Sequence, residues 1–403
     1  MKNDKCEMPK TVYVLGAGFS HDANMPLQSH ILDRVKDYYV GILSGKDNDE
    51  FLKISDTFVP DRKQLEGFLE AVFSSSKTPS LEDVFTLLDQ TIINKAYCHS
   101  YSWHQLDNIR DTLRRSILLI FHDALENFKK TENDFYKCLA AYWIKARIAA
   151  GRRGDPYSII SLDWDALVED SVYWCIDNAK CRKKVDIDFC CYSSPLDNSS
   201  PHTPSILQKA MGLYNIKLLK LHGSTNWLFC PNCNRMFTGV GSKQNAWSMY
   251  AIERSCIHCS NKDSKNKTPK LEPFFITPTY LKVFDNAHIQ MIWHNAHTEL
   301  AEADKIVFVG YSLPEADYHL RTLMKRAIRP GTPIDVVLTQ NDKPTKRTPR
   351  NLRRYYATTR FEDFFSSNSI KFYLGGVEPY FRRIIGRLDI RSKLRQINRK
   401  LTK

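Results

Sequence analysis

Five short apolar segments, separated by longer stretches of helical spacing, constrain the fold of this 403-residue chain more than any other feature. Each segment has the length and composition of a buried strand, and several are followed directly by Gly, Ser or Asp. The segments are Lys10–Gly16, Tyr157–Leu162, Ile216–Leu221, Lys305–Val309 and Ile334–Leu338. Strands that alternate with helices predict an α/β fold with a parallel sheet. Ligands of such sheets bind at the carboxyl ends of the strands.

The long stretch between the first two segments has a different pattern. From residue 28 to about residue 150, apolar residues recur at spacings of three and four, which is typical of amphipathic helices. A Gly-Asp-Pro sequence then breaks the pattern before the second strand. We therefore expect a helical insert between the first two strands.

The first strand ends in a glycine-rich turn that includes Gly16, Gly18 and Ser20. Glycine allows the backbone to approach a pyrophosphate closely, and a helix expected to begin near Ser20–Asp22 would favour negative charge at its N-terminus. A tight turn without a ligand explains the same residues. The turn lacks the complete G-x-G-x-x-G pattern and an acidic residue about 20 positions later, which disfavours an ordinary dehydrogenase.

Two other strand ends carry chemically active side chains. Asp163 and Asp165 follow the second strand, where a carboxylate can accept hydrogen bonds from sugar hydroxyls and stabilise a developing oxocarbenium charge. Either carboxylate can instead cap the following helix. His222 follows the third strand, where it is placed to act as a base or to bind a ribose hydroxyl, although a lone histidine is more often structural.

The cysteines contain the strongest local signal. Cys230 and Cys233 form one C-x-x-C pair, and Cys256 and Cys259 form a second pair after 22 intervening residues. Four thiolates at this spacing predict a tetrahedral zinc site, and the closed ligand set predicts a structural metal. His258 as a replacement ligand, or cysteine pairs without a metal, remain alternatives.

A second strand–turn–helix unit follows the fourth strand. Gly310 and Ser312 come directly after that strand, and Pro314 precedes the next predicted helix. The turn can cradle a ribose or phosphate, or it can simply begin a helix with Pro314 in its first turn.

The net charge of +13 lies entirely in the last 61 residues. Residues 343–403 contain 17 Lys or Arg against 4 Asp or Glu. A basic segment of this kind can attract nucleic acid or an acidic protein, or it can be a solvated surface with a charged terminal helix.

The order of these motifs resembles the sirtuin family, and especially the sirtuin-like NAD hydrolases of bacterial anti-phage defence. The resemblance extends over about residues 10–340. It implies a Rossmann-like NAD-binding catalytic domain over residues 1–342, with a helical insert at 28–150, a zinc ribbon insert at 226–275 and a basic C-terminal extension at 343–403. It also implies that NAD is the substrate and that zinc is structural.

The resemblance assigns roles to individual residues. Gly16, Ala17, Gly18 and Ser20 match the first nucleotide-binding turn of the family, and Gly310 and Ser312 match its late nucleotide contact. His222 matches the catalytic histidine, and Asp165 matches the aspartate that faces the nicotinamide. Asp163 stands where the family usually has a catalytic asparagine, and we expect its carboxylate to support a cationic sugar.

Two departures favour water over acyl-lysine as the acceptor. The first motif continues as HDANMPLQ, without the Asp-Phe-Arg of deacylases, and Leu271–Asn286 lacks an acyl-peptide-binding pattern. The expected activity is NAD glycohydrolysis, which yields nicotinamide and ADP-ribose or a cyclic isomer. A protein deacylase, a DNA-binding or nuclease module, and a non-catalytic NAD or ADP-ribose sensor are the alternatives.

The sequence also leads to expectations about the location of the protein and the control of its activity. The sequence has no apolar run of about 18 residues and no secretory leader, so we expect a cytoplasmic protein without membrane contact. Because uncontrolled cleavage would exhaust NAD, we expect gating by homo-oligomerisation or by a protein partner such as a ring-forming ATPase or helicase. Residues 343–403 are the candidate segment for assembly, partner docking or nucleic-acid binding.

Overall fold

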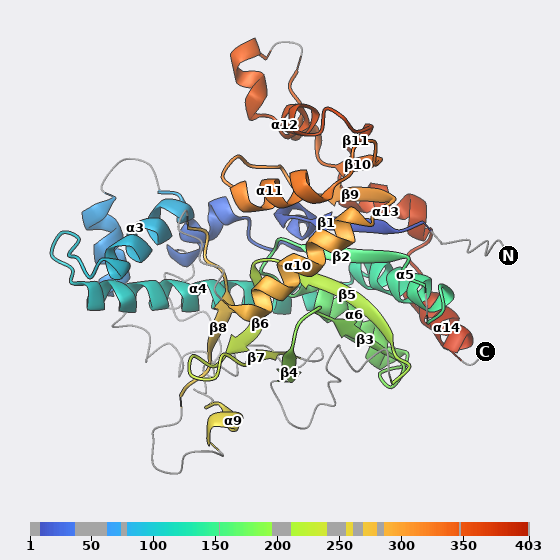
Figure 1. The fold of residues 1–403 in the computed structure, drawn as a ribbon, viewed down its shortest axis with the longest axis horizontal. Coiled ribbons are helices and arrows are strands. Elements are labelled where there is room, and N and C mark those ends of the chain that lie inside the picture. Colours follow the sequence, from blue (N-terminus) through green and yellow to red (C-terminus); the bar gives the residue numbers. More distant parts are fainter. Residues whose placement is uncertain are drawn as a thin grey trace.

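The computed structural model has a large parallel sheet at its centre, with helices packed around it (Figure 1). It describes residues 9–36, 63–73, 79–152, 154–195, 211–239, 255–260, 269–279, 286–345 and 348–401. Parts of the expected helical insert (37–62 and 74–78) and of the expected zinc ribbon (240–254 and 261–268) therefore lie outside the described residues.

Seven strands form the main sheet in the order β11-β10-β9-β1-β2-β5-β3, and every pair is parallel. The strands are β1 (Thr11–Leu15), β2 (Tyr157–Ser161), β3 (Val185–Asp188), β5 (Tyr214–Lys220), β9 (Lys305–Val309), β10 (Ile334–Val337) and β11 (Ile370–Tyr373). The predicted α/β class with a Rossmann-like parallel sheet is confirmed. The two edge strands, β3 and β11, were not expected from the sequence.

The strand register aligns the carboxyl ends of the central strands. Leu15, the last residue of β1, pairs with Ser161 of β2 and with Val309 of β9, and Ser161 pairs with Lys220 of β5. The strand order also reverses at β1, because the chain adds β2, β5 and β3 on one side and β9, β10 and β11 on the other. Such a switch point is where open α/β sheets bind their ligands.

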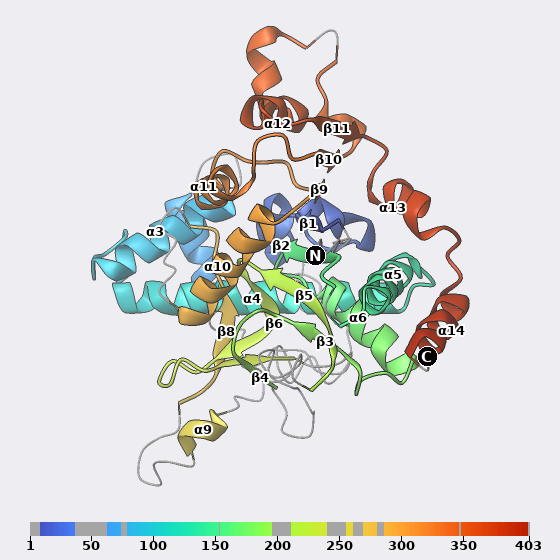
Figure 2. The same ribbon diagram turned by 45° about the vertical axis from the view of Figure 1, so that its right-hand side comes forward.

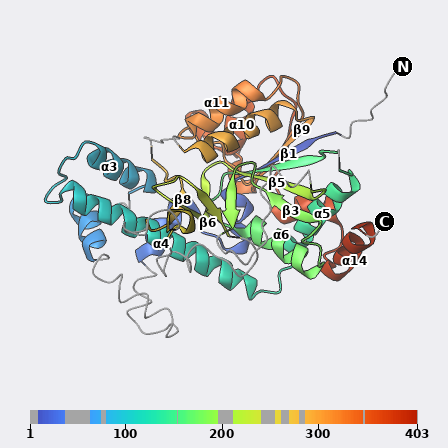
Figure 3. The same cartoon turned by 60° about the horizontal axis from the view of Figure 1, so that its bottom comes forward.

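Some helices pack against the main sheet, whereas others form a second core to one side of it. Those in the main core are α5 (Phe135–Ala149), α6 (Leu167–Asn178), α10 (Ala287–Ala301) and α11 (Tyr318–Ala327). The helices α3 (Leu81–Ile93) and α4 (Trp103–Lys129) build a second core at one end of the molecule (Figure 3). The long helix α4 joins the two cores, since Leu113 and Ile117 lie in the second core while Ala124 and Leu125 lie in the main one.

The glycine-rich turn after β1 does not open an α-helix, so the helix expected near Ser20–Asp22 is wrong. Two short 3-10 turns, Ala17–Phe19 and His21–Ala23, follow β1 instead. Asn24 then adopts a left-handed conformation with φ of 59°, which ends the second turn. Pro314 likewise does not lie in the first turn of a helix, because α11 begins at Tyr318.

The basic segment is built into the main sheet. It contributes β11 together with α12 (Ala357–Phe364), α13 (Val377–Ile385) and α14 (Ile390–Leu401). Phe361 of α12 packs on Phe308 of β9 with a centroid distance of 5.0 Å, and α14 packs along α5, at the opposite end of the molecule from α3 (Figure 2). Buried apolar side chains of this segment, such as Phe361, Phe381 and Ile397, are therefore part of the main core.

A smaller four-stranded sheet lies beyond the end of β5. Its strands have the order β4-β7-β6-β8, with bounds Ser193–Pro195, Met236–Thr238, Gly223–Phe229 and Glu272–Phe275. A short helix, α9 (Ile257–Ser260), lies beside it. Within the described ranges, no helix has both the length and the apolar composition needed to span a bilayer.

Candidate functional site

The two glycine turns expected to hold a nucleotide meet at the switch point. The Gly16 N–H donates to the Val309 carbonyl at 3.0 Å, and the Gly18 N–H donates to the Gly310 carbonyl at 2.9 Å. Gly310 has a φ of +63°, and a Cβ added there would lie 2.2 Å from the carbonyl carbon of Gly18. These glycines are therefore required for backbone-to-backbone packing, which makes the two turns one structural unit.

Neighbouring side chains hold this unit in place. Ala17 begins the 3-10 turn after Gly16, and Ser20, which is buried, follows it. The Tyr136 hydroxyl of α5 donates to the Phe19 carbonyl at 2.8 Å. The Ser312 carbonyl accepts hydrogen bonds from Nε (2.9 Å) and Nη2 (2.8 Å) of Arg360 on α12. Arg360 could not be predicted from the sequence, since nothing local relates it to a turn 48 residues earlier.

Asp165 belongs to the aspartate loop, which we define as residues 162–166 between β2 and α6. Its Oδ1 atom accepts a hydrogen bond from the Leu167 N–H at 2.9 Å, at the start of α6. The side chain is only 5% exposed. Ala166, not Asp165, is the N-cap residue of α6, but one carboxylate oxygen of Asp165 is occupied by the first N–H of that helix.

Asp163 lies in the same loop and has a different environment. Its Oδ2 atom is shielded from solvent, and no group in the described part of the chain hydrogen-bonds to it. Burial and the neighbouring Asp165 charge raise the pKa of Asp163 well above its usual value, although Lys220 opposes them. The carboxyl group therefore tends to keep its proton. Buried polar atoms normally have a hydrogen-bond partner, and a bound ligand can supply the partner that Asp163 Oδ2 lacks among the described residues.

His222 lies in the histidine segment, which we define as residues 220–225 and which links β5 to β6. Its Nδ1 atom is 3.1 Å from the Leu162 carbonyl oxygen. Because a carbonyl only accepts hydrogen bonds, Nδ1 carries the proton and Nε2 is the basic nitrogen of the neutral ring. The Ile276 N–H holds the His222 carbonyl at 2.8 Å, so the smaller sheet supports this turn.

Three buried groups near these residues were not assigned a role from the sequence. Lys220 and Glu169 are each 1% exposed, and Lys220 Nζ is 3.3 Å from Glu169 Oε1. Ser224 Oγ donates to the same Glu169 oxygen at 3.2 Å. The available signal was the position of Lys220 between Leu219 and Leu221 in a predicted buried strand, because lysine is rarely buried without a partner.

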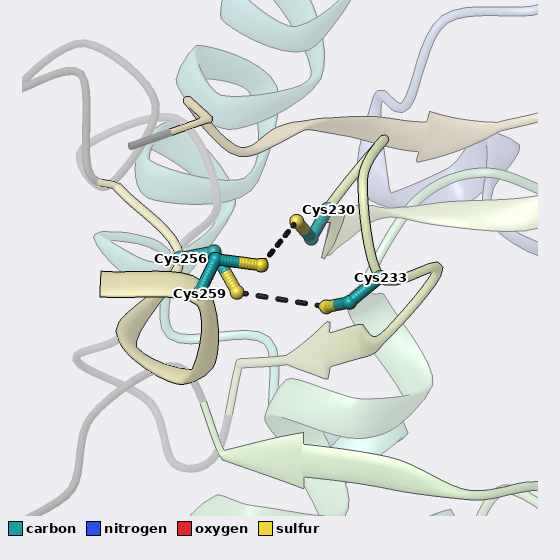
Figure 4. Close-up of side chains that lie close together, drawn as sticks. All are labelled: Cys230, Cys233, Cys256 and Cys259. Carbon is teal, nitrogen blue, oxygen red and sulfur yellow. Dashed lines mark hydrogen bonds between the residues drawn. The ribbon is translucent and has the colours of Figure 1, made fainter. Parts of the chain in front are cut away.

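The four cysteines of the two C-x-x-C pairs come together at the edge of the smaller sheet (Figure 4). Their sulfur atoms all lie within 4.8 Å of one another. The Cys230–Cys259 and Cys233–Cys256 sulfur distances are both 3.7 Å. Tetrahedral zinc with bonds of about 2.3 Å requires sulfur separations of roughly 3.8 Å. The donor set and its spacing therefore fit a structural zinc ion.

Comparisons with known proteins give only distant structural similarity. No protein-family model matches the chain, and no curated protein matches it. It is similar to the crystal structure of a Sir2 homologue in complex with NAD, with 13% identity, 96% of this chain and 90% of the other covered, and a TM-score of 0.36. A Sir2 protein bound to a propionylated peptide gives 12% identity, 93% and 91% coverage, and a TM-score of 0.37. A sirtuin structure concerned with substrate affinity gives 13% identity, 93% and 92% coverage, and a TM-score of 0.39.

Proposed function

We propose that this chain binds NAD across the carboxyl ends of β9, β1, β2 and β5 and hydrolyses the bond between nicotinamide and ribose. The main support for the proposal is that four adjacent strands end at the same edge of the sheet, and each is followed by a residue of one of the sequence motifs. Gly16, Asp163, His222 and Gly310 follow adjacent strands whose last residues pair in register. The order of the same motifs along the chain resembles that of sirtuin-like NAD hydrolases.

The nucleotide part of NAD would lie on the two joined turns. Gly16, Ala17, Gly18 and Ser20 form the first turn, and Gly310 with Ser312 form the second. Small residues on both turns keep the backbone open to the pyrophosphate, and the serine hydroxyls can hydrogen-bond to phosphate or ribose oxygens. Among the described residues, 3-10 turns follow the first glycine turn and α11 begins only at Tyr318, so we expect the affinity for phosphate to come mainly from these polar groups.

The nicotinamide end would lie beside the aspartate loop. Asp163 and Asp165 supply two carboxyl groups, and Lys220, the cation that faces them among the described residues, is paired with the buried carboxylate of Glu169. This excess of acidic groups favours a positively charged nicotinamide and the oxocarbenium-like sugar that forms as it leaves. A cationic ligand also favours ionisation of Asp163, because an opposite charge lowers the pKa of a carboxyl group.

The hydrolysis can be written with His222 as the general base. Nicotinamide leaves with the electron pair of the C1′–N bond, and a water oxygen bonds to C1′. Nε2 of His222 accepts a proton from that water, and Asp165 orients the carboxamide. The products are nicotinamide, ADP-ribose and a proton released to solvent.

The zinc site has a supporting role in this proposal. Cys230, Cys233, Cys256 and Cys259 would hold a structural zinc that stabilises the smaller sheet and leaves no open position for water. Strands β6 and β8 of that sheet flank His222, since Gly223 pairs with Phe275 and the Ile276 N–H holds the His222 carbonyl.

Regulation and biological role follow as further parts of the proposal. Residues 1–342 would act as the catalytic unit, and residues 343–403 as the segment for assembly or docking of a partner such as a ring-forming ATPase or helicase. The contact from Arg360 to the Ser312 carbonyl supports a link between this segment and the second turn. The motif resemblance suggests NAD depletion during anti-phage defence as the outcome.

A direct experiment follows nicotinamide release from NAD by chromatography. We expect release by the wild-type chain and a loss of at least about 100-fold in His222→Ala and Asp163→Ala, as for removal of acid–base groups. The exposed residues His294 and Asp363 provide matched controls, because alanine there should leave the rate unchanged. Equal release by all variants would contradict the assignment.

The same experiment separates the alternative functions. Release that depends on an added acyl-peptide would indicate a deacylase. Tight NAD binding without release, at chain concentrations high enough for self-assembly, would indicate a sensor. Absence of NAD binding combined with DNA binding that falls steeply with salt would indicate a nucleic-acid-binding module.

A further inference from the structure

The aspartate loop and the histidine segment interlock through backbone carbonyl groups. Three carbonyls of the loop accept hydrogen bonds from side chains of the segment. His222 Nδ1 bonds to the Leu162 carbonyl (3.1 Å), Thr225 Oγ1 bonds to the Trp164 carbonyl (2.9 Å), and Lys220 Nζ bonds to the Asp165 carbonyl. Ser224 Oγ lies 3.2 Å from both the Trp164 carbonyl and Glu169 Oε1, which share its single proton. The position of Asp163 relative to His222 is therefore determined by these contacts.

Lys220 differs from the other donors because it is charged and almost fully buried. Moving an ammonium group out of water costs free energy, and the ion pair with Glu169 offsets only part of this cost. Glu169 adds a cost of its own, because its Oε2 atom is buried and no group in the described part of the chain hydrogen-bonds to it. A buried ion pair of this kind can often be replaced by apolar residues without loss of stability. Stability alone therefore does not account for a lysine at this position.

We propose that Lys220 is a positioning residue, whose ammonium group fixes the aspartate loop, and with it Asp163, against His222. The inference rests on the proposed function, because it assigns Lys220 to the same reaction. Lys220 ends β5, two residues before His222, and bonds to the loop two residues after Asp163. The Lys220 side chain thus connects the histidine segment, which carries His222, to the backbone of the aspartate loop, which carries Asp163.

The test removes both charges of the buried pair, so that no unpaired charge remains. Lys220→Met alone leaves Glu169 buried and unpaired, and it should destabilise the fold. The double variant Lys220→Met/Glu169→Met should fold, but it lacks the bond to the Asp165 carbonyl. We expect its kcat for nicotinamide release to fall about 10- to 100-fold, as for a small misplacement of reacting groups, while the KM for NAD changes less because the glycine turns are untouched.

A matched control removes a second buried Lys–Glu pair, whose lysine lies on the same strand, three residues before Lys220. Lys217 Nζ is 2.6 Å from Glu299 Oε1, and both side chains are largely buried. Lys10 and Asp155 also contact that pair, and they keep their contact with each other when it is removed. The double variant Lys217→Met/Glu299→Met should retain the wild-type kcat. A wild-type kcat in Lys220→Met/Glu169→Met, or an equal fall of kcat in the control, would overturn the positioning role.

Hydrogen exchange without NAD separates this inference from the proposed function. The Thr225 N–H bonds to the Trp164 carbonyl (2.8 Å) and the Leu167 N–H bonds to Asp165 Oδ1 (2.9 Å), so both amides report whether the loop is held. We expect both to exchange faster in Lys220→Met/Glu169→Met than in the wild type and the control. Unchanged exchange overturns the inference even if the wild type releases nicotinamide. Faster exchange without nicotinamide release would show that Lys220 holds the aspartate loop and would contradict the proposed reaction instead.

A single variant keeps the inference testable if the double variant does not fold. Glu169→Gln removes the carboxylate but leaves the bond from Lys220 to the Asp165 carbonyl. Both Glu169→Gln and Lys220→Met leave one buried charge without its partner, so both should be less stable than the wild type. The kcat of folded Glu169→Gln should stay within about threefold of the wild type, whereas that of folded Lys220→Met should fall about 10- to 100-fold. A fall of kcat in Glu169→Gln as large as in Lys220→Met overturns the positioning role.

Discussion

Replacing Gly310 by alanine tests whether the two glycine turns form one tightly packed unit. The new Cβ would lie 2.2 Å from the Gly18 carbonyl carbon and 2.2 Å from the Phe19 nitrogen, both of which are backbone atoms. The left-handed φ of +63° adds about 1–2 kcal/mol for any residue with a Cβ. Overpacking against rigid neighbours adds roughly 1–3 kcal/mol. We therefore expect a loss of about 2–5 kcal/mol in the free energy of unfolding.

Gly331 provides the matched control for the conformational part of this cost. It has a similar φ of +83°, but an added Cβ would meet nothing within 4 Å. Gly331→Ala should therefore lose only about 1–2 kcal/mol. Urea unfolding of both variants at neutral pH, with comparable m-values, measures the difference. Similar losses in the two variants would refute the backbone contact between the turns.

Three other perturbations have expected outcomes. Asp163→Asn should stabilise the fold near pH 8 and have almost no effect near pH 3, because the raised pKa of Asp163 makes the wild type lose stability as pH rises through the usual carboxyl value of 3.8; thermal unfolding against pH measures this. Lys10→Met should cost about 3 kcal/mol in urea unfolding, because Lys10 Nζ lies within 2.9 Å of three carboxylates while its side chain is 8% exposed. Cys233→Ser should reduce bound zinc from about one ion per chain, measured by elemental analysis, whereas Cys98→Ser should not.

For each of these three variants, one result would contradict the expected outcome. An Asp163→Asn variant less stable than the wild type at pH 8 would show that the carboxylate is stabilised by a partner. A Lys10→Met variant with unchanged stability would show that its carboxylates are adequately paired without it. Equal zinc content in wild type and Cys233→Ser would remove Cys233 from the metal site.

The central strands could be predicted because both faces of each are buried. A continuous apolar run such as that of β9 is a local signal that does not depend on the rest of the fold. The edge strands β3 and β11 lack it. β3 contains Asp186 and Asp188, whose side chains are satisfied by Ile187 and Asn215 within the folded protein, and β11 is partly exposed along its length.

Site residues could be predicted where the chemistry is local, and not where it depends on distant contacts. The spacing of the four cysteines is itself the signal for a metal site. The burial of Lys220 against Glu169 and the bond from Arg360 to Ser312 exist only after the chain has folded. The helix expected after Gly18 was wrong because Asn24 tolerates a left-handed conformation, which sequence periodicity does not reveal.

Hydrogen exchange with and without NAD tests the central claim most directly, because it locates binding even when a partner is needed for turnover. The account predicts that NAD slows amide exchange at residues 16–20, 162–166, 221–224 and 310–313, which follow four adjacent strands. Absence of protection at saturating NAD, or protection confined to other parts of the chain, would contradict an NAD site at the carboxyl ends of these strands.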